Sequence, residues 1–363
     1  MASKKTALEN VLSDRSISKY IDDGSIVTGG EEEDEGDVMP FVTRFPSFNL
    51  MIGIGGLPKG KIVEISGEEG ACKSAICWAI CGDVQRQGKI AAWIDAEQAI
   101  DFRVPKQRKF IMSLGCNYRE VIIVRPETAE MGFTIANALA NNPDIGVIVY
   151  DSIVALANQR EDNAEITKED RNTLPQTINK GLRKCAKSLR KTDCTMLIIN
   201  QLRENTERMG PYDKKWKTTG GKGLKHWASL RIFVFKSTIK NSDKEVIGIC
   251  PQCRIEKTRF DVPRDNAKMF YYYNKGFNIT EEIVELAIVW GILEKSGNSY
   301  VYDGEKKTKA KWLEYLDSDE GKETLDEILE VTSEEYNAYY DGDDEYDVDE
   351  DLGEVDEEEE DDE

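Results

Sequence analysis

Short apolar runs alternate with stretches of helical periodicity between about residues 41 and 274. The helical stretches, such as residues 74–87 and 174–190, repeat apolar side chains every three to four positions. Alternation of short strands with helices is typical of an α/β fold built on a mostly parallel central sheet. The apolar runs that predict strands are residues 61–66, 90–95, 121–124, 146–151, 195–200 and 230–235.

Three further apolar runs follow these strands and complete the predicted core. We expect residues 246–250 and 253–258 to form a hairpin, because Pro251 and Gln252 separate them in the manner of a turn. Residues 269–273 predict one more strand. A helix over 279–290, a short strand over 300–302 and a helix over 311–316 then predict a small α+β C-terminal lobe.

The two ends of the chain differ from this core. Residues 5–29 predict an amphipathic helix and a short strand, which are too small to fold alone and must dock on something. From about residue 333 the chain is too polar to bury enough apolar surface to order itself. The expected divisions are an N-terminal segment with an acidic loop (1–40), a core (41–275), a C-terminal lobe (276–332) and a disordered acidic tail (333–363).

The negative charge of the chain is concentrated in two segments. The 363 residues carry a formal net charge of −21, of which residues 341–363 contribute 17 acidic side chains and residues 31–37 contribute 6. Neither segment contains a basic residue, so the remainder of the chain has a net charge of +2. Phosphate binding requires a basic surface. The body of the protein is therefore free to bind an anion.

The apolar pattern also bears on the cellular compartment. No apolar run approaches the roughly 18 residues of a membrane span, and the polar N-terminus lacks the apolar region of a signal peptide. The cysteines lie mostly in apolar helix and strand patterns, which is typical of reduced thiols. We expect a cytoplasmic protein with no membrane partner, in which Cys77 and Cys81 are core. Cys250 and Cys253 are interpreted as two turn thiols rather than a zinc site, although a metal site stays open.

A glycine-containing loop, GEEGACKS at residues 67–74, joins the first predicted strand to a helix. In this context the loop N–H groups would surround a β-phosphate, Lys73 would neutralise β- and γ-phosphate oxygens, and the Ser74 hydroxyl would ligate Mg²⁺. Cys72 stands where the phosphate-loop pattern has its second glycine. Its Cβ would either lower the affinity or be absorbed by a small shift of the loop. The expected contacts are Gly67, Glu68, Glu69, Gly70, Ala71, Cys72, Lys73, Ser74 and Ala75.

Polar residues follow three of the predicted strands where each one ends. Glu97 follows the strand at 90–95, Asp151 ends the strand at 146–151, and Gln201 follows the strand at 195–200. The carboxyl ends of parallel strands form the edge at which open α/β sheets bind ligands. We therefore expect these three side chains beside Lys73, with Asp151 holding Mg²⁺ through water.

This ordered set of motifs resembles the bacterial RecA recombinase family over about residues 5–330. The segments that carry the resemblance include GGLPKGKIVEISG (55–67), WIDAEQAID (93–101), VIVYDSIVAL (147–156), IINQLR (198–203) and TTGGKGLKHWAS (218–229). The resemblance implies a RecA-type P-loop ATPase core with an N-terminal helix-plus-strand polymerisation segment. It also implies a helical homo-oligomeric filament on single-stranded DNA, with ATP between adjacent subunits.

The resemblance implies individual roles as well. Glu97 would be the general base that activates water, and Gln201 would sense the γ-phosphate. Lys257 and Arg259 would reach the γ-phosphate of the neighbouring subunit, where cations supplied in trans neutralise charge that develops in phosphoryl transfer. Without the resemblance, these two residues would be interpreted as a basic edge strand. The remaining nucleotide positions that it implies are Asp101 and Tyr273 beside the adenine, with Lys73, Ser74 and Asp151 at the phosphates.

Two polar loops at the same sheet edge, at about 160–173 and 203–221, are candidates for contact with DNA. Loops of this length in a compact domain are usually functional or disordered. The second interleaves basic residues with Met and aromatic residues, which suit phosphate contacts and base stacking without reading base edges. The candidate contacts are Arg203, Arg208, Met209, Lys217, Gly220, Gly221 and Lys222, together with Arg183, which the resemblance adds.

The leading hypothesis is an ATP-dependent recombinase that pairs single-stranded DNA with homologous duplex DNA and exchanges strands. One alternative is a filament-forming DNA-binding protein whose ATPase is weak because of Cys72. Another is a different ATPase on the same core, such as a ring helicase. The N-terminal segment and the C-terminal lobe favour the filament. His226, the one histidine, is interpreted as an imidazole packed at the subunit interface.

Overall fold

The computed structural model describes residues 40–153, 155, 173–204, 216–218, 221–260, 264 and 266–341. Of residues 173, 203, 204, 217, 222 and 341 it describes the backbone alone. The predicted N-terminal polymerisation segment, the acidic run at 31–37 and the acidic residues beyond 341 lie outside the described residues.

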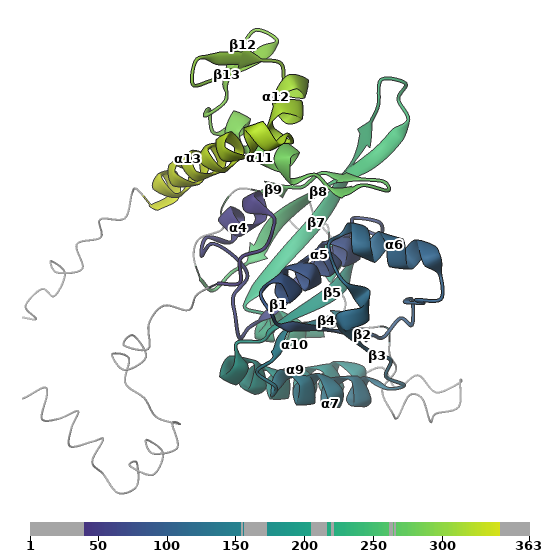
Figure 1. Cartoon of the computed structure of the whole chain (residues 1–363). Coiled ribbons are helices and arrows are strands. Elements are labelled where there is room, and N and C mark those ends of the chain that lie inside the picture. Colours follow the sequence, from purple (N-terminus) through teal and green to yellow (C-terminus); the bar gives the residue numbers. More distant parts are fainter. Residues whose placement is uncertain are drawn as a thin grey trace, which may run out of the picture. The chain divides into compact units, whose positions relative to one another are not determined.

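The centre of the fold is a mixed sheet in which β1 (Ile62–Gly67) lies between β5 (Thr195–Glu204) and β7 (Leu230–Lys240). From β7 across to β3 the neighbouring strands are parallel, so their carboxyl ends meet at one edge. This arrangement confirms the α/β class with a mostly parallel central sheet (Figure 1). The outer strands of the parallel part are β4 (Ile145–Asp151), β2 (Ile90–Asp95) and β3 (Val121–Val124).

An antiparallel part extends the sheet beyond β7. The predicted hairpin around Pro251 is wrong, because β8 (Val246–Lys257) runs through Pro251 and Gln252 without a break and pairs with β7 along its length. The turn lies instead between β7 and β8, where Asn241 Oδ1 accepts hydrogen bonds from the backbone of Asp243 at 3.0 Å and Glu245 at 2.9 Å. Shorter strands complete this part: β9 (Ala267–Lys268), β10 (Tyr271–Tyr272) and β11 (Gly276–Phe277). Another short strand, β6 (Trp216–Thr218), lies outside this part and pairs with β5.

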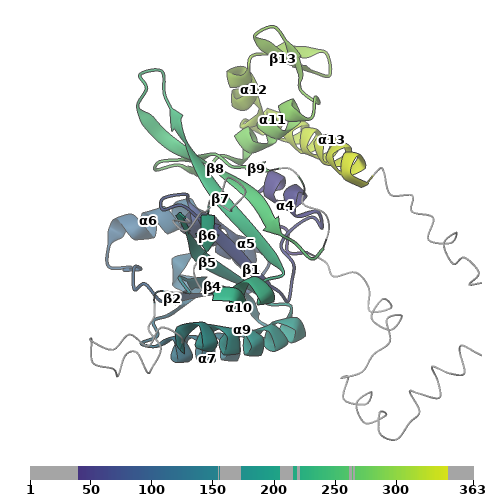
Figure 2. The same cartoon turned by 180° about the vertical axis from the view of Figure 1, so that it is seen from behind.

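Helices cover both faces of the parallel strands (Figures 1 and 2). One face packs against α5 (Lys73–Arg86) and α6 (Pro105–Ser113), with the stacked rings of Trp78 and Trp93 4.1 Å apart. The other face packs against helices that follow later in the chain. Side chains alternate between these two faces along each strand, so β1 is buried throughout. The second set of helices is α7 (Ala129–Ala140), α9 (Thr173–Thr192) and α10 (Gly221–Trp227).

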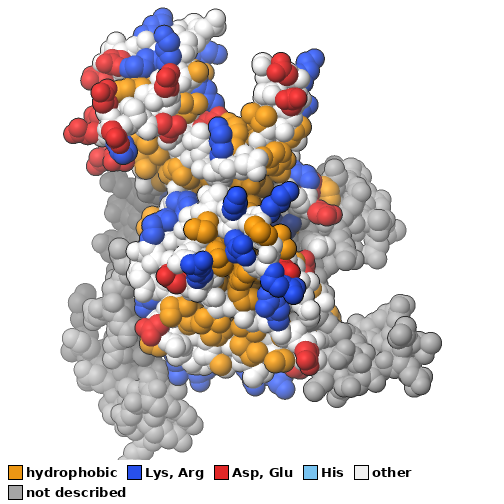
Figure 3. Space-filling view, turned by 45° about the vertical axis from the view of Figure 1, so that its right-hand side comes forward, with side chains coloured by type: hydrophobic (Ala, Val, Ile, Leu, Met, Phe, Trp, Pro, Cys, Tyr) orange, Lys and Arg blue, Asp and Glu red, His pale blue; other side chains and the backbone are white. Residues whose placement is uncertain are grey.

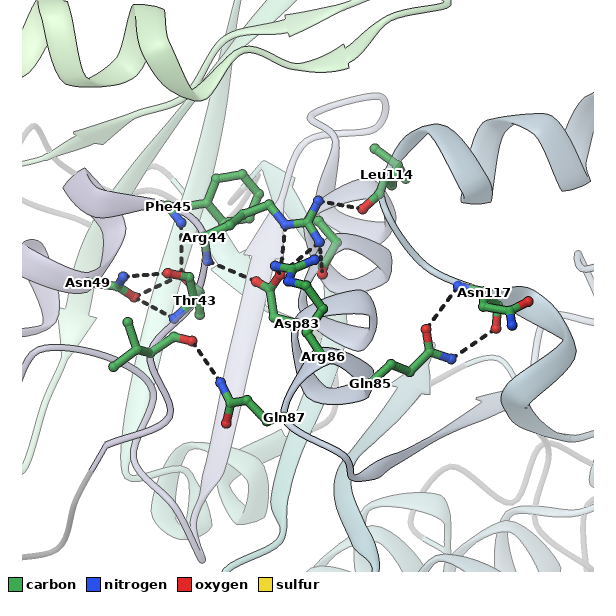
Figure 4. A network of polar contacts seen from close by, with 12 residues as sticks. Thr43, Arg44, Phe45, Asn49, Asp83, Gln85, Arg86, Gln87, Leu114 and Asn117 are labelled. Carbon is green, nitrogen blue, oxygen red and sulfur yellow. Dashed lines mark hydrogen bonds and ion pairs between the residues drawn. The ribbon is translucent and has the colours of Figure 1, made fainter. Parts of the chain in front are cut away.

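A polar network fastens the chain that enters the core to α5 (Figure 4). Arg44 donates from its backbone N–H to Asp83 Oδ2 at 2.9 Å and from Nε to Asp83 Oδ1 at 2.8 Å. The same guanidinium donates to the carbonyl oxygen of Leu114 at 2.7 Å. Asp83 is buried, so these bonds pair a charge that would be costly to leave unpaired. The network holds the helix whose first turn begins at the glycine-containing loop.

The C-terminal lobe has a core of its own, formed by residues such as Trp312, Leu316 and Ile328. Glu282 joins it to α4 (Pro46–Ile52), because its Oε1 accepts hydrogen bonds from the backbone N–H of Ser47 at 2.8 Å and from Ser47 Oγ at 2.7 Å. The lobe comprises α11 (Ile279–Val289), β12 (Glu294–Ser296), β13 (Ser299–Tyr302), β14 (Glu305–Lys307), α12 (Lys309–Leu316) and α13 (Lys322–Asp341).

The prediction that the chain cannot order itself from about residue 333 is wrong for residues 333–341. Helix α13 continues to Asp341 and buries Ile328, Thr332 and Tyr336 on one side. These residues are spaced by four, which places them on one face of a helix. The acidic residues between them hid that apolar face in the sequence.

Candidate nucleotide-binding site

The phosphate loop occupies the turn between β1 and α5. Gly67 ends the strand and pairs with Val234 of β7, so closely that a Cβ on Gly67 would lie 2.4 Å from the Val234 carbonyl oxygen. Only glycine fits this close approach of two backbones. Lys73 is the first residue of α5, so the loop ends at a helix N-terminus with free N–H groups. The structure therefore has the strand–loop–helix context that a phosphate site requires.

Cys72 caps α5 in a left-handed conformation, with φ 63° and ψ 17°. Glycine adopts this conformation freely, whereas a Cβ makes it costly. Burial raises the pKa of the Cys72 thiol to about 11, although Lys236 and Lys73 oppose that shift. The thiol is therefore protonated at neutral pH. The departure from the glycine pattern is accommodated by a strained backbone at the helix start.

Lys73 and Ser74, the first two residues of α5, contact different partners. Lys73 Nζ donates to the carbonyl oxygens of Gly67 at 3.0 Å and Glu68 at 2.7 Å, and burial lowers the pKa of this lysine. Ser74 Oγ donates to Asp151 Oδ2 at 3.1 Å. A hydroxyl and a carboxylate oxygen are hard donors of the kind that Mg²⁺ prefers, and Mg²⁺ usually keeps several waters besides one or two protein ligands. Ser74 and Asp151 therefore fit that ion.

The strands bring Glu97 and Asp151 to the same edge. Asp95 and Asp151 are in register on β2 and β4, and the backbone N–H of Glu97 donates to the Asp151 carbonyl oxygen at 3.3 Å. Burial, followed by the nearby charge of Glu97, raises the pKa of Asp151 to about 6. The Glu97 side chain is exposed at this edge. The structure thus places both carboxylates beside Lys73 and Ser74.

Asp95 shapes the turn that carries Glu97, a role that sequence reasoning missed. Its buried carboxylate accepts hydrogen bonds from the backbone N–H groups of Ala99 at 2.9 Å and Ile100 at 3.1 Å. Arg125 Nε lies 3.5 Å from Asp95 Oδ2. The signal in the sequence is an acid at the end of an apolar strand, a position from which carboxylates commonly bond the backbone of the turn that follows.

Gln201 stands opposite Gly67 in the parallel pairing of β5 with β1. The predicted strand ends too early, since β5 continues to Glu204 and pairs with β6 on the far side of the candidate loop. Asn200 Nδ2 donates to the buried Glu64 Oε1 at 2.8 Å, and Arg231 contacts the other oxygen of Glu64 and donates to Thr218 Oγ1 at 3.1 Å. Polar contacts thus connect β5 and β1 to Thr218 of β6, near the end of the second candidate DNA loop.

The two candidate adenine residues lie on neighbouring segments. Asp101 bonds Arg103, with its Oδ2 2.9 Å from Nη2, and this hydrogen bond lowers the pKa of Asp101 to about 2. Tyr273 is 44% exposed, with its ring 6.2 Å from that of Tyr271. The ring of Tyr271 in turn lies 6.5 Å from Phe110 of α6, the helix that follows Asp101. The exposed side chain of Tyr273 is therefore available for stacking on a base.

Lys257 and Arg259 do not join the phosphate loop of their own chain. Lys257 Nζ donates to the carbonyl oxygens of Lys225 at 2.9 Å and Ala228 at 2.8 Å, and Arg259 Nη2 donates to that of His226 at 2.8 Å. Lys257 pairs with Arg231 near the start of β7, whereas Gly67 pairs with Val234 farther along that strand. Both cations therefore lie toward the sheet edge opposite the phosphate loop.

The candidate DNA contacts are described in part. Arg183 is exposed on α9, and Gly221 begins α10 with φ 74°. Trp227 Nε1 at the end of α10 donates to Asn179 Oδ1 of α9 at 2.7 Å, which joins these two helices. Figure 3 shows a further group of Lys and Arg side chains on the middle of one face of the molecule, which is not assigned to these candidate residues. Arg208, Met209 and Gly220 lie outside the described residues, as do the side chains of Arg203, Lys217 and Lys222.

The cysteine pair of β8 does not lie in a turn, as the sequence had indicated. Cys250 and Cys253 are both buried within a continuous strand, where residues three apart point to opposite faces. Among the described residues no group of three or more His, Cys, Asp or Glu side chains is arranged to hold a metal ion. Cys77 and Cys81 are fully buried, as predicted. His226 is exposed at the end of α10.

The parallel sheet, the strand–loop–helix turn and the carboxylates at the strand ends define a P-loop nucleotide-binding ATPase. A sequence model of the RecA N-terminal domain matches residues 6–278. Protein RecA of Delftia acidovorans is 32% identical over 304 residues, covering 84% of this chain and 80% of the relative. Protein RecA of Mycoplasma mycoides is 33% identical over 320 residues, covering 87% of this chain and 90% of the relative. Protein RecA of Clostridium tetani is 32% identical over 326 residues, covering 88% of this chain and 89% of the relative. The chain belongs to the RecA family.

Membership of this family defines the general activity. The chain is a DNA-dependent ATPase that acts as an ATP-dependent recombinase in recombination and repair. RecA proteins bind single-stranded DNA and form filaments. Within the described residues, no helix has the length and apolar character needed to cross a membrane.

Proposed function

We propose that this protein polymerises on single-stranded DNA with Mg²⁺–ATP and exchanges strands with a homologous duplex. The observation that carries the proposal is the position of Gln201. It is in register with Gly67 at the phosphate loop. Its strand continues to Glu204 and pairs with β6, so that β5 and β6 flank the second candidate DNA loop. A change at the γ-phosphate would therefore act on a strand that leads to the candidate DNA contacts.

For hydrolysis, the proposal assigns the side chains at the sheet edge as follows. Lys73 would turn from the loop carbonyls toward β- and γ-phosphate oxygens, and Glu97 would accept a proton from the attacking water. Ser74 and Asp151 would hold Mg²⁺, which supplies charge neutralisation at the phosphates. The hydrogen bonds of Asp95 to the turn support the placement of Glu97.

The position of Lys257 and Arg259 supports a role in trans. They lie toward the opposite sheet edge from the phosphate loop of their own chain, where they cap the carbonyl groups at the end of α10. Only a neighbouring subunit could then present them to a nucleotide. Hydrolysis would depend on assembly, because cations supplied in trans stabilise charge that develops in phosphoryl transfer.

A joint-molecule assay tests the proposed exchange. Circular single-stranded DNA is incubated with ATP, Mg²⁺ and the protein, and then with linear duplexes of matched length that are homologous or heterologous. We expect joint molecules with the homologous duplex alone. Equal products with both duplexes, or none with either, would contradict strand exchange. Electron microscopy of the same mixture separates a filament from a ring helicase, because closed hexamers would favour the latter.

A further inference from the structure

A second lysine, Lys236 of β7, reaches the phosphate loop. β1 ends at Gly67, which pairs with Val234, but β7 continues beyond that point to Lys240. Lys236 is two residues farther on than Val234 and so lies on the same face of the strand. The part of β7 beyond Val234 therefore runs alongside the loop that follows Gly67.

Two contacts place the ammonium group of Lys236 on the loop itself. Lys236 Nζ donates a hydrogen bond to the carbonyl oxygen of Glu69. A Cβ added to Gly70 would lie 3.3 Å from the same Nζ. Lys236 also lies close enough to Cys72, the cap of α5, and to Lys73, its first residue, for its charge to act on both. The side chain is exposed, so solvent and ligands have access to it.

Two ammonium groups around one loop suit a polyanion. Lys73 of α5 donates hydrogen bonds to the loop carbonyl oxygens of Gly67 and Glu68, and Lys236 of β7 donates one to that of Glu69. Like charges disfavour each other, and a bound anion between them reverses that effect. Cys72 adds a reason for external support, because its left-handed backbone is costly without glycine.

We propose that Lys236 is a nucleotide-binding residue of the same subunit, which positions the loop through Glu69 and adds positive charge for the triphosphate. This inference rests on the phosphate loop being the nucleotide site under the proposed function. The proposed role of Lys236 is to raise the affinity for ATP. The alternative role of this exposed lysine is contact with a DNA phosphate.

Lys236→Met and Lys240→Met in the full chain form a matched pair for the test. Lys240 lies on the same face of the same strand, about 13 Å farther along. Binding of a fluorescent ATP analogue is measured without DNA, and the ATPase kinetics are measured with saturating single-stranded DNA. We expect Lys236→Met to weaken ATP binding by about tenfold, as the loss of one charge-assisted contact. We also expect KM to rise with little change in kcat, Lys236→Arg to restore most of the affinity, and Lys240→Met to match the wild type.

Two results would overturn the inference. One is an ATP affinity of Lys236→Met within about twofold of the wild type, a difference below 0.5 kcal/mol. The other is weakened DNA binding at unchanged ATP affinity, which would assign the lysine to DNA. A wild-type protein that binds no ATP would instead contradict the nucleotide site itself, so the two failures are distinguishable.

Discussion

Arg231 donates its Nε–H to the carboxylate of Glu64, and both side chains are buried, with 6% and 0% of their surface exposed. Glu64 belongs to β1, three residues before the phosphate loop, and its other oxygen accepts hydrogen bonds from Ser66 at 2.9 Å and Asn200 at 2.8 Å. The pair therefore joins β1, β5 and β7 beneath the sheet edge that carries the candidate site.

Removal of Glu64 should destabilise the protein strongly. Glu64→Ala leaves the Arg231 guanidinium buried without its partner, and we expect the free energy of unfolding to fall by about 3–5 kcal/mol in urea titrations. The double variant Glu64→Met with Arg231→Met removes both charges. Its free energy of unfolding should fall less than that of Glu64→Ala. A loss below about 1 kcal/mol for Glu64→Ala would show that the ion pair is not a structural element.

Cys72→Gly should relieve the left-handed strain at the start of α5. We expect the free energy of unfolding to rise by about 0.5–1 kcal/mol, because glycine carries no Cβ penalty at positive φ but loses more entropy on folding. ATP should also bind more tightly. Cys72→Ala is the control, since it keeps the Cβ and removes the sulfur. If the free energy of unfolding rises equally in Cys72→Gly and Cys72→Ala, the effect comes from removal of the thiol and not from relief of backbone strain.

The junction of the C-terminal lobe should make stability depend on pH. Glu282 is 1% exposed, and its Oε2 has no hydrogen-bond partner among the described residues. Burial raises its pKa to about 8, although the two bonds from Ser47 oppose that shift. The unfolded chain ionises near pH 4.3. The contribution of Glu282 to the free energy of unfolding is therefore fully present below about pH 4.3 and is lost progressively as the pH rises to about 8.

Urea titrations of the wild type and Glu282→Gln at pH 6, 7 and 8 test this dependence. Between pH 6 and pH 8 the free energy of unfolding of the wild type should fall by about 2 kcal/mol more than that of the variant. The slope is about 1.4 kcal/mol per pH unit and decreases near the folded-state pKa of about 8. Groups other than Glu282 contribute to both proteins and cancel in the difference. Parallel pH profiles would show that Glu282 keeps its charge in the folded state.

Glu97→Gln should separate binding from hydrolysis. The amide keeps the size of the side chain but cannot accept a proton, so we expect ATP turnover to fall about 10²- to 10⁴-fold. Binding of ATP and single-stranded DNA should stay within about twofold. Glu120→Gln, an exposed acid at the amino end of β3, is the control and should turn over ATP normally. Normal turnover by Glu97→Gln would require another base.

The parallel strands and the phosphate edge could be predicted from the sequence because both depend on local patterns. Apolar runs indicated β1, β2, β4 and β5, and the polar residues at or just after the ends of these runs marked the edge where Lys73, Glu97 and Asp151 lie. The contacts of Arg231 and Lys236 could not be predicted in this way. They depend on the register of β7 against β1, which joins residues more than 160 positions apart.

The errors in the antiparallel part have a similar origin. Pro251 indicated a turn, but in the folded sheet it is a buried residue of β8 whose carbonyl oxygen accepts a hydrogen bond from Met269 at 3.0 Å. The turn at 241–245 carries ordinary turn residues, Asn, Ser and Asp. It was missed because the outer half of β7, from Lys236 to Lys240, is largely polar and exposed.

The most direct test of the account is the rate of ATP hydrolysis with and without single-stranded DNA. Assembly on DNA should bring Lys257 and Arg259 of one subunit to the nucleotide of the next. We therefore expect DNA to raise the turnover number by at least about tenfold, since cations supplied in trans are worth more than that in related phosphoryl transfers. The same rate with and without DNA would contradict a site that is completed by assembly.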